Sequence, residues 1–273
     1  MCTICSTTTS PRHLCSSLIR TGASCGATSA RTAVTGRASR RFWGNCREGR
    51  DAKHKAPNVK CRASVSRTTI TYDHIAARYA AREAYPLERE LTRFRQMAPE
   101  RGLVLDVGCG PGQYARALES RGLRVVALDL SMSMLRQAHT SGTPRLVRAD
   151  MRRLPFASGC TDGCFACASL LHLPRTQAPQ VLLEFHRVLR TGGALYVGVK
   201  EGRGEEWVAD PQGYERFFAY YQPEEIDRLI QAAGFEIVDG WINPPGRDQC
   251  HNWINRFAVT RDRKRILQVY GVL

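Results

Sequence analysis

The sequence predicts an α/β fold with a doubly wound, mainly parallel sheet of seven strands. From residue 71 onward, short apolar runs alternate with segments of helical periodicity, which is typical of a parallel sheet with helices on both faces. The first run breaks directly into a glycine-rich loop, 106–112, and open α/β sheets bind ligands at such strand ends. Only a loop separates the last two runs, so we expect them to pair antiparallel.

The elements follow one another in a regular order. Helices are expected at 71–84, 113–121, 131–139, 178–190 and 223–235. Strands are expected at 103–108, 123–130, 145–150, 162–169, 193–199, 236–241 and 253–260. Ser131 is a suitable N-cap for the helix that it opens. Residues 62–273 are therefore expected to form a single domain.

The first 61 residues differ in composition from the rest. They hold eight arginines and three lysines against two acids, a formal charge of +9, and they are rich in Ser, Thr and Ala. This composition predicts a disordered organelle transit peptide read by the import machinery, with cleavage near Cys61. The many Ser and Thr residues favour the chloroplast, with the mitochondrion as the alternative. A disordered tail without an address is the other interpretation.

Charge and cysteine usage limit the remaining function classes. The chain carries +15 overall, which leaves a mild +6 after residue 61, so nucleic acid is permitted as a partner but not indicated. No apolar run approaches the ~20 residues of a membrane span. The eleven cysteines are unevenly spaced and odd in number, which argues against a disulfide framework and for a reducing compartment.

The glycine loop discriminates between ligands. Glycines allow a sharp turn and a close approach of backbone to ligand. A dinucleotide site needs a third glycine where this chain has Gln113, and Asp106 would repel a pyrophosphate. An acid at that place suits a ligand with an ammonium group.

These residues resemble a known family. VLDVGCGPG (104–112) resembles motif I of the class I S-adenosylmethionine-dependent methyltransferases, type 11/25, and the resemblance extends from about residue 70 to 260. It implies that Asp129 holds the ribose hydroxyls, that Asp150 and Met151 meet the adenine, and that Tyr79 lies over the methionine part. The implied S-adenosylmethionine-binding residues are Tyr79, Asp106, Gly108, Cys109, Gly110, Asp129, Leu130, Asp150, Met151 and Cys167. The alternative for Asp129, taken alone, is a cap of the helix that begins at Ser131, and the alternative for Asp150 is an acid of a loop.

A second cysteine pattern points elsewhere. Cys160, Cys164 and Cys167 have the CxxxCxxC spacing of radical iron–sulfur enzymes. Cys164 and Cys167 fall within one predicted strand, where their side chains point to opposite faces. We therefore expect no metal site.

The acceptor side is less specific. His172 follows the fourth strand and is the candidate general base, with a structural histidine as the alternative. Residues 200–223 are the expected lid over the acceptor, where Arg216, Phe217, Tyr220 and Tyr221 suit a flat or lipophilic acceptor with a carboxylate or phosphate. Packing over the sheet edge is the alternative for these aromatics. Arg247, His251 and Trp253 are expected to border the same pocket.

Three functions are compatible with this pattern. Methyl transfer to a small organic acceptor is favoured, because the domain carries no added recognition module. An RNA methyltransferase and a non-catalytic S-adenosylmethionine-binding protein are the alternatives.

Overall fold

The computed structural model describes residues 59–82, 85–246 and 249–261. The predicted transit peptide, 1–61, lies outside the described residues except for 59–61, which are the first residues of helix α1. Within the described ranges, no helix is both long enough and apolar enough to cross a bilayer.

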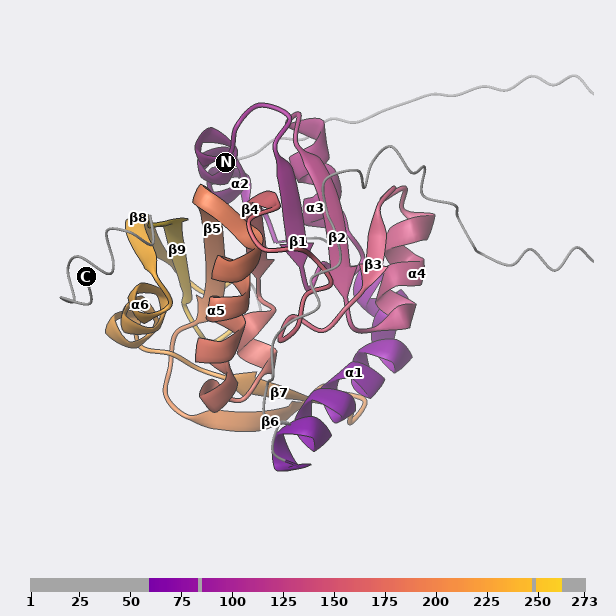
Figure 1. The fold of residues 1–273 in the computed structure, drawn as a ribbon. Coiled ribbons are helices and arrows are strands. Elements are labelled where there is room, and N and C mark those ends of the chain that lie inside the picture. The colour runs from indigo at the N-terminus through magenta and orange to yellow at the C-terminus, as the bar shows by residue number, and fades with distance from the viewer. Residues whose placement is uncertain (1–58, 83–84, 247–248, 262–273) are drawn as a thin grey trace, which may run out of the picture. The chain divides into compact units, whose positions relative to one another are not determined.

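Seven strands of the described chain form one sheet in the order β3-β2-β1-β4-β5-β9-β8 (Figure 1). The strands are β1 (Leu103–Val107), β2 (Arg124–Asp129), β3 (Leu146–Arg148), β4 (Thr161–Cys167), β5 (Leu189–Lys200), β8 (Phe235–Asn243) and β9 (Trp253–Thr260). Neighbours from β3 to β5 are parallel, and β9 is antiparallel to both β5 and β8. The predicted fold class is confirmed, including the antiparallel pair at the C-terminal end.

Two apolar cores lie on opposite faces of this sheet. α5 (Ala178–Val188) and α6 (Pro223–Ala232) pack on one face. α2 (Glu88–Met97) and α3 (Gln113–Ser120) pack on the other face, and α4 (Met132–Thr140) lies beside β2 and β3. β4 is buried on both sides, with Cys164 in the first core and Phe165 in the second, as expected for a central parallel strand.

Helix α1 (Val59–Ala80) begins well before the predicted start at residue 71 and ends before the predicted end at residue 84. Its inward face consists of Val65, Thr68, Thr71, Ile75 and Ala76, all buried. Threonines interrupt the apolar periodicity of this face, so the first half of α1 could not be predicted from the sequence pattern. The expected domain boundary at residue 61 therefore falls inside the first turn of α1.

The threonines of α1 are explained by a β-hairpin. β6 (Glu205–Ala209) and β7 (Glu215–Ala219) pair antiparallel within the predicted lid, 200–223, and lie beside α1 (Figure 1). The Thr71 hydroxyl donates to the Glu215 carbonyl over 2.6 Å, and the Phe217 amide donates to the Thr68 hydroxyl over 3.2 Å. These bonds satisfy backbone groups at the edge of the hairpin.

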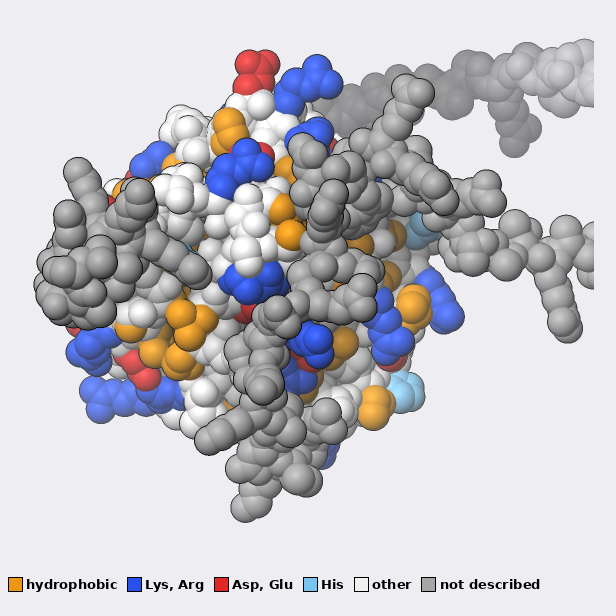
Figure 2. All heavy atoms as spheres, viewed as in Figure 1, with side chains coloured by type: hydrophobic (Ala, Val, Ile, Leu, Met, Phe, Trp, Pro, Cys, Tyr) orange, Lys and Arg blue, Asp and Glu red, His pale blue; other side chains and the backbone are white. Residues whose placement is uncertain are grey.

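Charged side chains of both signs lie on the face of the molecule seen in Figure 2. On the face seen in Figure 2, Lys and Arg side chains are scattered among uncharged and apolar ones and form no continuous stripe.

Candidate active site

A cavity of about 320 Å³ lies where β1, β2 and β4 end, with α1 across it. All but one of the residues expected to bind the cofactor line it, and so does His172. The lining includes Tyr79, Gly108, Cys109, Gly110, Asp129, Leu130, Asp150, Met151 and Cys167. The loops at these strand ends thus bring together residues that are far apart in the sequence.

The glycine loop bends tightly after β1. The amides of Gly108 and Cys109 both donate to the carbonyl of Leu128, over 2.7 and 2.8 Å. Gly108, Gly110 and Gly112 all have positive φ angles, of 76°, 53° and 79°. A Cβ added at Gly110 would have only Tyr79 within reach, at 4.0 Å, so this glycine faces open space in the cavity.

Asp129 is held by this loop. One carboxylate oxygen accepts from the Gly110 amide at 2.9 Å, and the other accepts from the Ser131 amide at 2.8 Å. A carboxylate has about four acceptor positions, so it can still accept from a vicinal diol. The predicted N-cap of α4 is confirmed, because the Ser131 hydroxyl accepts from the Met134 amide at 3.1 Å. Asp129 is therefore not needed as the cap.

Asp106 is the exception among the expected cofactor-binding residues, because it does not line the cavity. It is 2% exposed, on the side of β1 that faces α3, and one of its carboxylate oxygens has no hydrogen-bond partner among the described residues. Burial, together with the nearby Asp129, raises the pKa of Asp106 to about 7. A cationic group in the cavity would offset the cost of these two buried acids. The Ser169 hydroxyl in the cavity wall is likewise unpartnered within the described chain. These orphaned groups fit a ligand with an ammonium group.

Asp150 lies at the expected end of the cavity but already has a partner. The Arg152 Nε donates to its two carboxylate oxygens over 2.9 and 3.0 Å, and the Arg152 amide donates to one of them over 2.9 Å. The acid is thereby fixed in orientation, and Met151 lines the cavity beside it.

His172 ends the short helix η1 (Leu170–His172), and both of its ring nitrogens are bonded. The Phe217 carbonyl can only accept, so Nδ1 carries the proton and donates to it over 2.7 Å. Nε2 is then the acceptor for the Tyr72 hydroxyl, also at 2.7 Å. Burial lowers the pKa of His172 to about 3. This geometry supports the structural alternative for His172 over the general base.

The four expected lid residues do not line this cavity. Phe217, Tyr220 and Tyr221 are buried beneath or beside the hairpin, and the Tyr220 ring stacks on His251 at 4.3 Å. All three belong to the apolar core on the face of the sheet that α5 and α6 cover, so packing is their observed use. Arg216 lies near Tyr72, its guanidinium 5.8 Å from the ring centre. Trp253 does line the cavity, whereas Arg247 lies outside the described residues.

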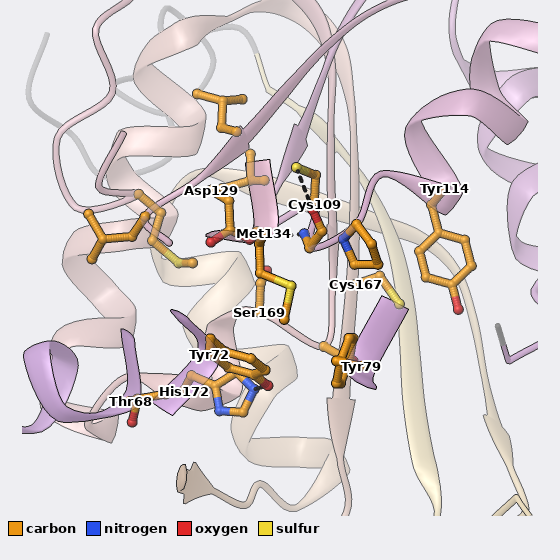
Figure 3. Close-up of a pocket in the computed structure, with 18 of the residues that line it drawn as sticks. Thr68, Tyr72, Tyr79, Cys109, Tyr114, Asp129, Met134, Cys167, Ser169 and His172 are labelled. Atoms are coloured by element: carbon orange, nitrogen blue, oxygen red, sulfur yellow. Dashed lines mark hydrogen bonds between the residues drawn. The ribbon is translucent and has the colours of Figure 1, made fainter. Parts of the chain in front are cut away.

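Several lining residues were missed by the sequence analysis. Tyr72, Thr68, Met134 and Ser169 all contribute to the wall. Figure 3 shows Tyr72, Tyr79 and His172 together on one side of the cavity, away from Asp129 and Cys109. Tyr72 precedes Tyr79 by two helical turns, and that spacing on α1 was a signal that could have found it.

The cysteine motif forms no cluster. Cys164 and Cys167 belong to the cores on opposite faces of the sheet. In the part of the chain that the structure describes, no group of three potential ligands is placed to hold a metal ion.

Comparisons with known proteins show the family of the chain. Residues 105–197 match the family model described as a methyltransferase domain. A malonyl-[acyl-carrier protein] O-methyltransferase of Hamiltonella defensa is 30% identical over 174 residues, which are 60% of this chain and 67% of that protein. An uncharacterised chloroplastic methyltransferase of Arabidopsis thaliana is 32% identical over 160 residues, covering 52% of this chain and 45% of the relative. The chain therefore spans less than half of the Arabidopsis protein.

Solved structures share the fold. A 1,6-didemethyltoxoflavin-N1-methyltransferase of Burkholderia thailandensis, solved with bound 1,6-didemethyltoxoflavin and S-adenosylhomocysteine, has a TM-score of 0.61 and 23% identity. The match covers 80% of this chain and 95% of that one. A [4+2]-cyclase has a TM-score of 0.57 and 18% identity over 77% of this chain and 99% of that one. The fold alone therefore does not define the reaction.

The doubly wound sheet and the glycine loop after β1 define a Rossmann-like α/β fold. With the sequence relatives, they show that the chain belongs to the class I S-adenosylmethionine-dependent methyltransferases. It is an enzyme of that family, and S-adenosylmethionine is its cofactor.

Proposed function

We propose that the protein methylates a small organic acceptor bound at the Tyr72–His172 side of the cavity. The observation that carries this proposal is a single cavity with two different ends. Asp129 and the glycine loop line one end, and aromatic residues of α1 and β9 line the other. The names of the relatives support it, since they include an O-methyltransferase of a malonyl group and an N-methyltransferase of a heterocycle.

The residues divide the work between them. The bound cofactor supplies an electrophilic methyl group on sulfur. Asp129 would hold the ribose hydroxyls, and Asp150 and Met151 would lie at the adenine. Asp129, together with Asp106 behind the cavity wall, would supply negative potential for the ammonium group. α1 covers the cavity and excludes water from it. Tyr79 and Tyr72 on this helix orient the cofactor and the methyl acceptor relative to each other.

His172 acts here as a positioning residue. Its accepting nitrogen is occupied by the Tyr72 hydroxyl, and the neutral form is strongly favoured. The best acceptors are therefore atoms that already offer a lone pair, such as a carboxylate oxygen or a neutral ring nitrogen. An acyl group on a carrier protein is the second candidate acceptor, favoured by the name of the Hamiltonella relative.

The cofactor site is tested by calorimetric titration of the full chain with S-adenosylmethionine, S-adenosylhomocysteine and, as a control, NAD. Asp129→Ala removes the acceptor of two charge-assisted hydrogen bonds, worth about 1.5–3 kcal/mol each, so affinity should fall roughly 100-fold or more. Asp239→Ala, which removes an acid paired with Arg93 on the surface, is the matched control and should bind normally. Failure of both sulfur ligands to bind, or equal binding by Asp129→Ala, would contradict the assigned site.

We further propose that residues 1–61 direct the protein to the chloroplast, with the mitochondrion as the alternative. The composition of the segment and the chloroplastic Arabidopsis relative support this address. A fluorescent protein carrying residues 1–61 should enter plastids of plant cells. Diffuse cytosolic fluorescence would refute the address.

A further inference from the structure

Two cations meet at the aromatic side of the cavity. The Lys200 Nζ lies 4.5 Å from the centre of the Phe218 ring, and the Arg216 guanidinium carbon lies 5.4 Å from it. The same ring packs against His172 at 4.9 Å. The Phe218 ring thus lies between the two cations, Lys200 and Arg216, and His172, which lines the cavity.

Neither cation forms an ion pair within the described chain. The Arg216 Nε is buried and has no acceptor there. The nearest acids are engaged elsewhere, because Glu206 accepts from the Tyr220 hydroxyl at 2.7 Å and Asp210 pairs with Arg78. Burial and the neighbouring Arg216 charge lower the pKa of Lys200.

This arrangement is costly without an anion. Like charges held together in a partly buried place repel each other, and their desolvation is not offset by an acid. Interaction with the face of Phe218 recovers only part of this cost. Both cations also flank the cavity wall, since Lys200 Nζ is 5.9 Å from the Trp253 ring centre and Arg216 is 5.8 Å from that of Tyr72.

We propose that Lys200 and Arg216 form a subsite for an oxyanion of the methyl acceptor, a carboxylate or a phosphate. This inference rests on the proposed function and narrows its substrate class to anionic acceptors. Neither Lys200 nor Arg216 lines the cavity, but each lies against a residue of its wall, Trp253 or Tyr72. A planar guanidinium matches a carboxylate or phosphate in two-point contact. Tyr72 and His172 then define the neutral wall beside the anion.

The test uses the full chain saturated with S-adenosylhomocysteine. Malonate, inorganic phosphate and the neutral analogue malonamide are titrated by calorimetry, and the melting temperature is recorded with each. The variants are Lys200→Met and Arg216→Gln, with Arg203→Gln as the control, which removes a positive charge from an exposed position in the same segment.

We expect at least one anion to bind the wild type and Arg203→Gln, with affinity lowered about tenfold or more in Lys200→Met and in Arg216→Gln. Malonamide should not bind. The tighter of malonate and phosphate identifies the kind of oxyanion. Without anion, Lys200→Met should melt at or above the wild-type temperature, because it relieves repulsion.

Several results would overturn the subsite. The first is that neither anion binds at tens of millimolar, and the second is that both variants bind the anions as well as the wild type. The third is that Lys200→Met melts well below the wild type, which would mean that Lys200 has a structural role. If S-adenosylhomocysteine itself fails to bind, the proposed function fails. If it binds and the anions do not, only the anionic subsite is refuted.

Discussion

Two glycines of the loop, Gly112 and Gly110, should differ sharply when each is replaced by alanine. At Gly112, φ is +79° and an added Cβ would lie 2.3 Å from the Thr143 hydroxyl and 3.0 Å from Ala138. The left-handed backbone costs about 1–2 kcal/mol and the overlap about 1–3 kcal/mol, so Gly112→Ala should lose roughly 2–5 kcal/mol of stability. At about 2–4 °C per kcal/mol, the melting temperature should fall by roughly 5–20 °C.

Gly110→Ala should behave differently, because its Cβ would enter open cavity space near Tyr79. It should lose only the backbone cost of about 1–2 kcal/mol, yet bind S-adenosylhomocysteine at least about tenfold more weakly. Melting by circular dichroism and titration calorimetry measure the two effects separately. The reasoning is refuted if Gly110→Ala melts as low as Gly112→Ala, or if it binds the ligand as well as the wild type.

Two further predictions concern buried polar groups. The pKa of His172 is lower in the folded state than in the unfolded state, so the stability that the neutral ring contributes is complete above pH ~6.5 and is lost as the pH falls toward about 3. His172→Gln should therefore lose less stability than the wild type when the pH is lowered from about 7.5 to about 5. Denaturant titrations at both pH values measure this difference. An equal loss in the two proteins would count against a buried neutral histidine. The Tyr221 hydroxyl is buried without a partner in the described structure, so Tyr221→Phe should leave the melting temperature unchanged or raise it. By contrast, Tyr196→Phe removes a buried donor to Asn255, at 2.8 Å, and should cost about 1–3 kcal/mol; equal melting of the two variants would contradict this difference.

The cofactor end of the site could be predicted from the sequence because its residues follow strand ends. A buried strand is a local apolar run, and parallel strands place their carboxyl ends at one edge of the sheet. Gly108, Gly110 and Asp129 are therefore found from short motifs. Asp106 does not line the cavity and lies on the side of β1 that faces α3, because side chains alternate along a strand; its expected role toward the cofactor stays a prediction.

The acceptor end depended on contacts between distant segments. The hairpin of β6 and β7 places the Phe217 carbonyl against His172, a residue 45 positions earlier, and this bond decides which ring nitrogen carries the proton. Aromatic composition in 200–223 could not show that Phe217, Tyr220 and Tyr221 pack in the core and do not line the cavity, because that depends on how the hairpin pairs and packs against α1.

By itself, the sequence determined the fold class, the glycine loop, the family and its cofactor, because each depends on local periodicity or on a short motif. Only the tertiary structure decided that α1 begins at Val59, that His172 is held by Tyr72, and that Lys200 and Arg216 meet at Phe218. The reason is physical: a residue's charge state and partners depend on what packs against it, and here those partners lie many residues away.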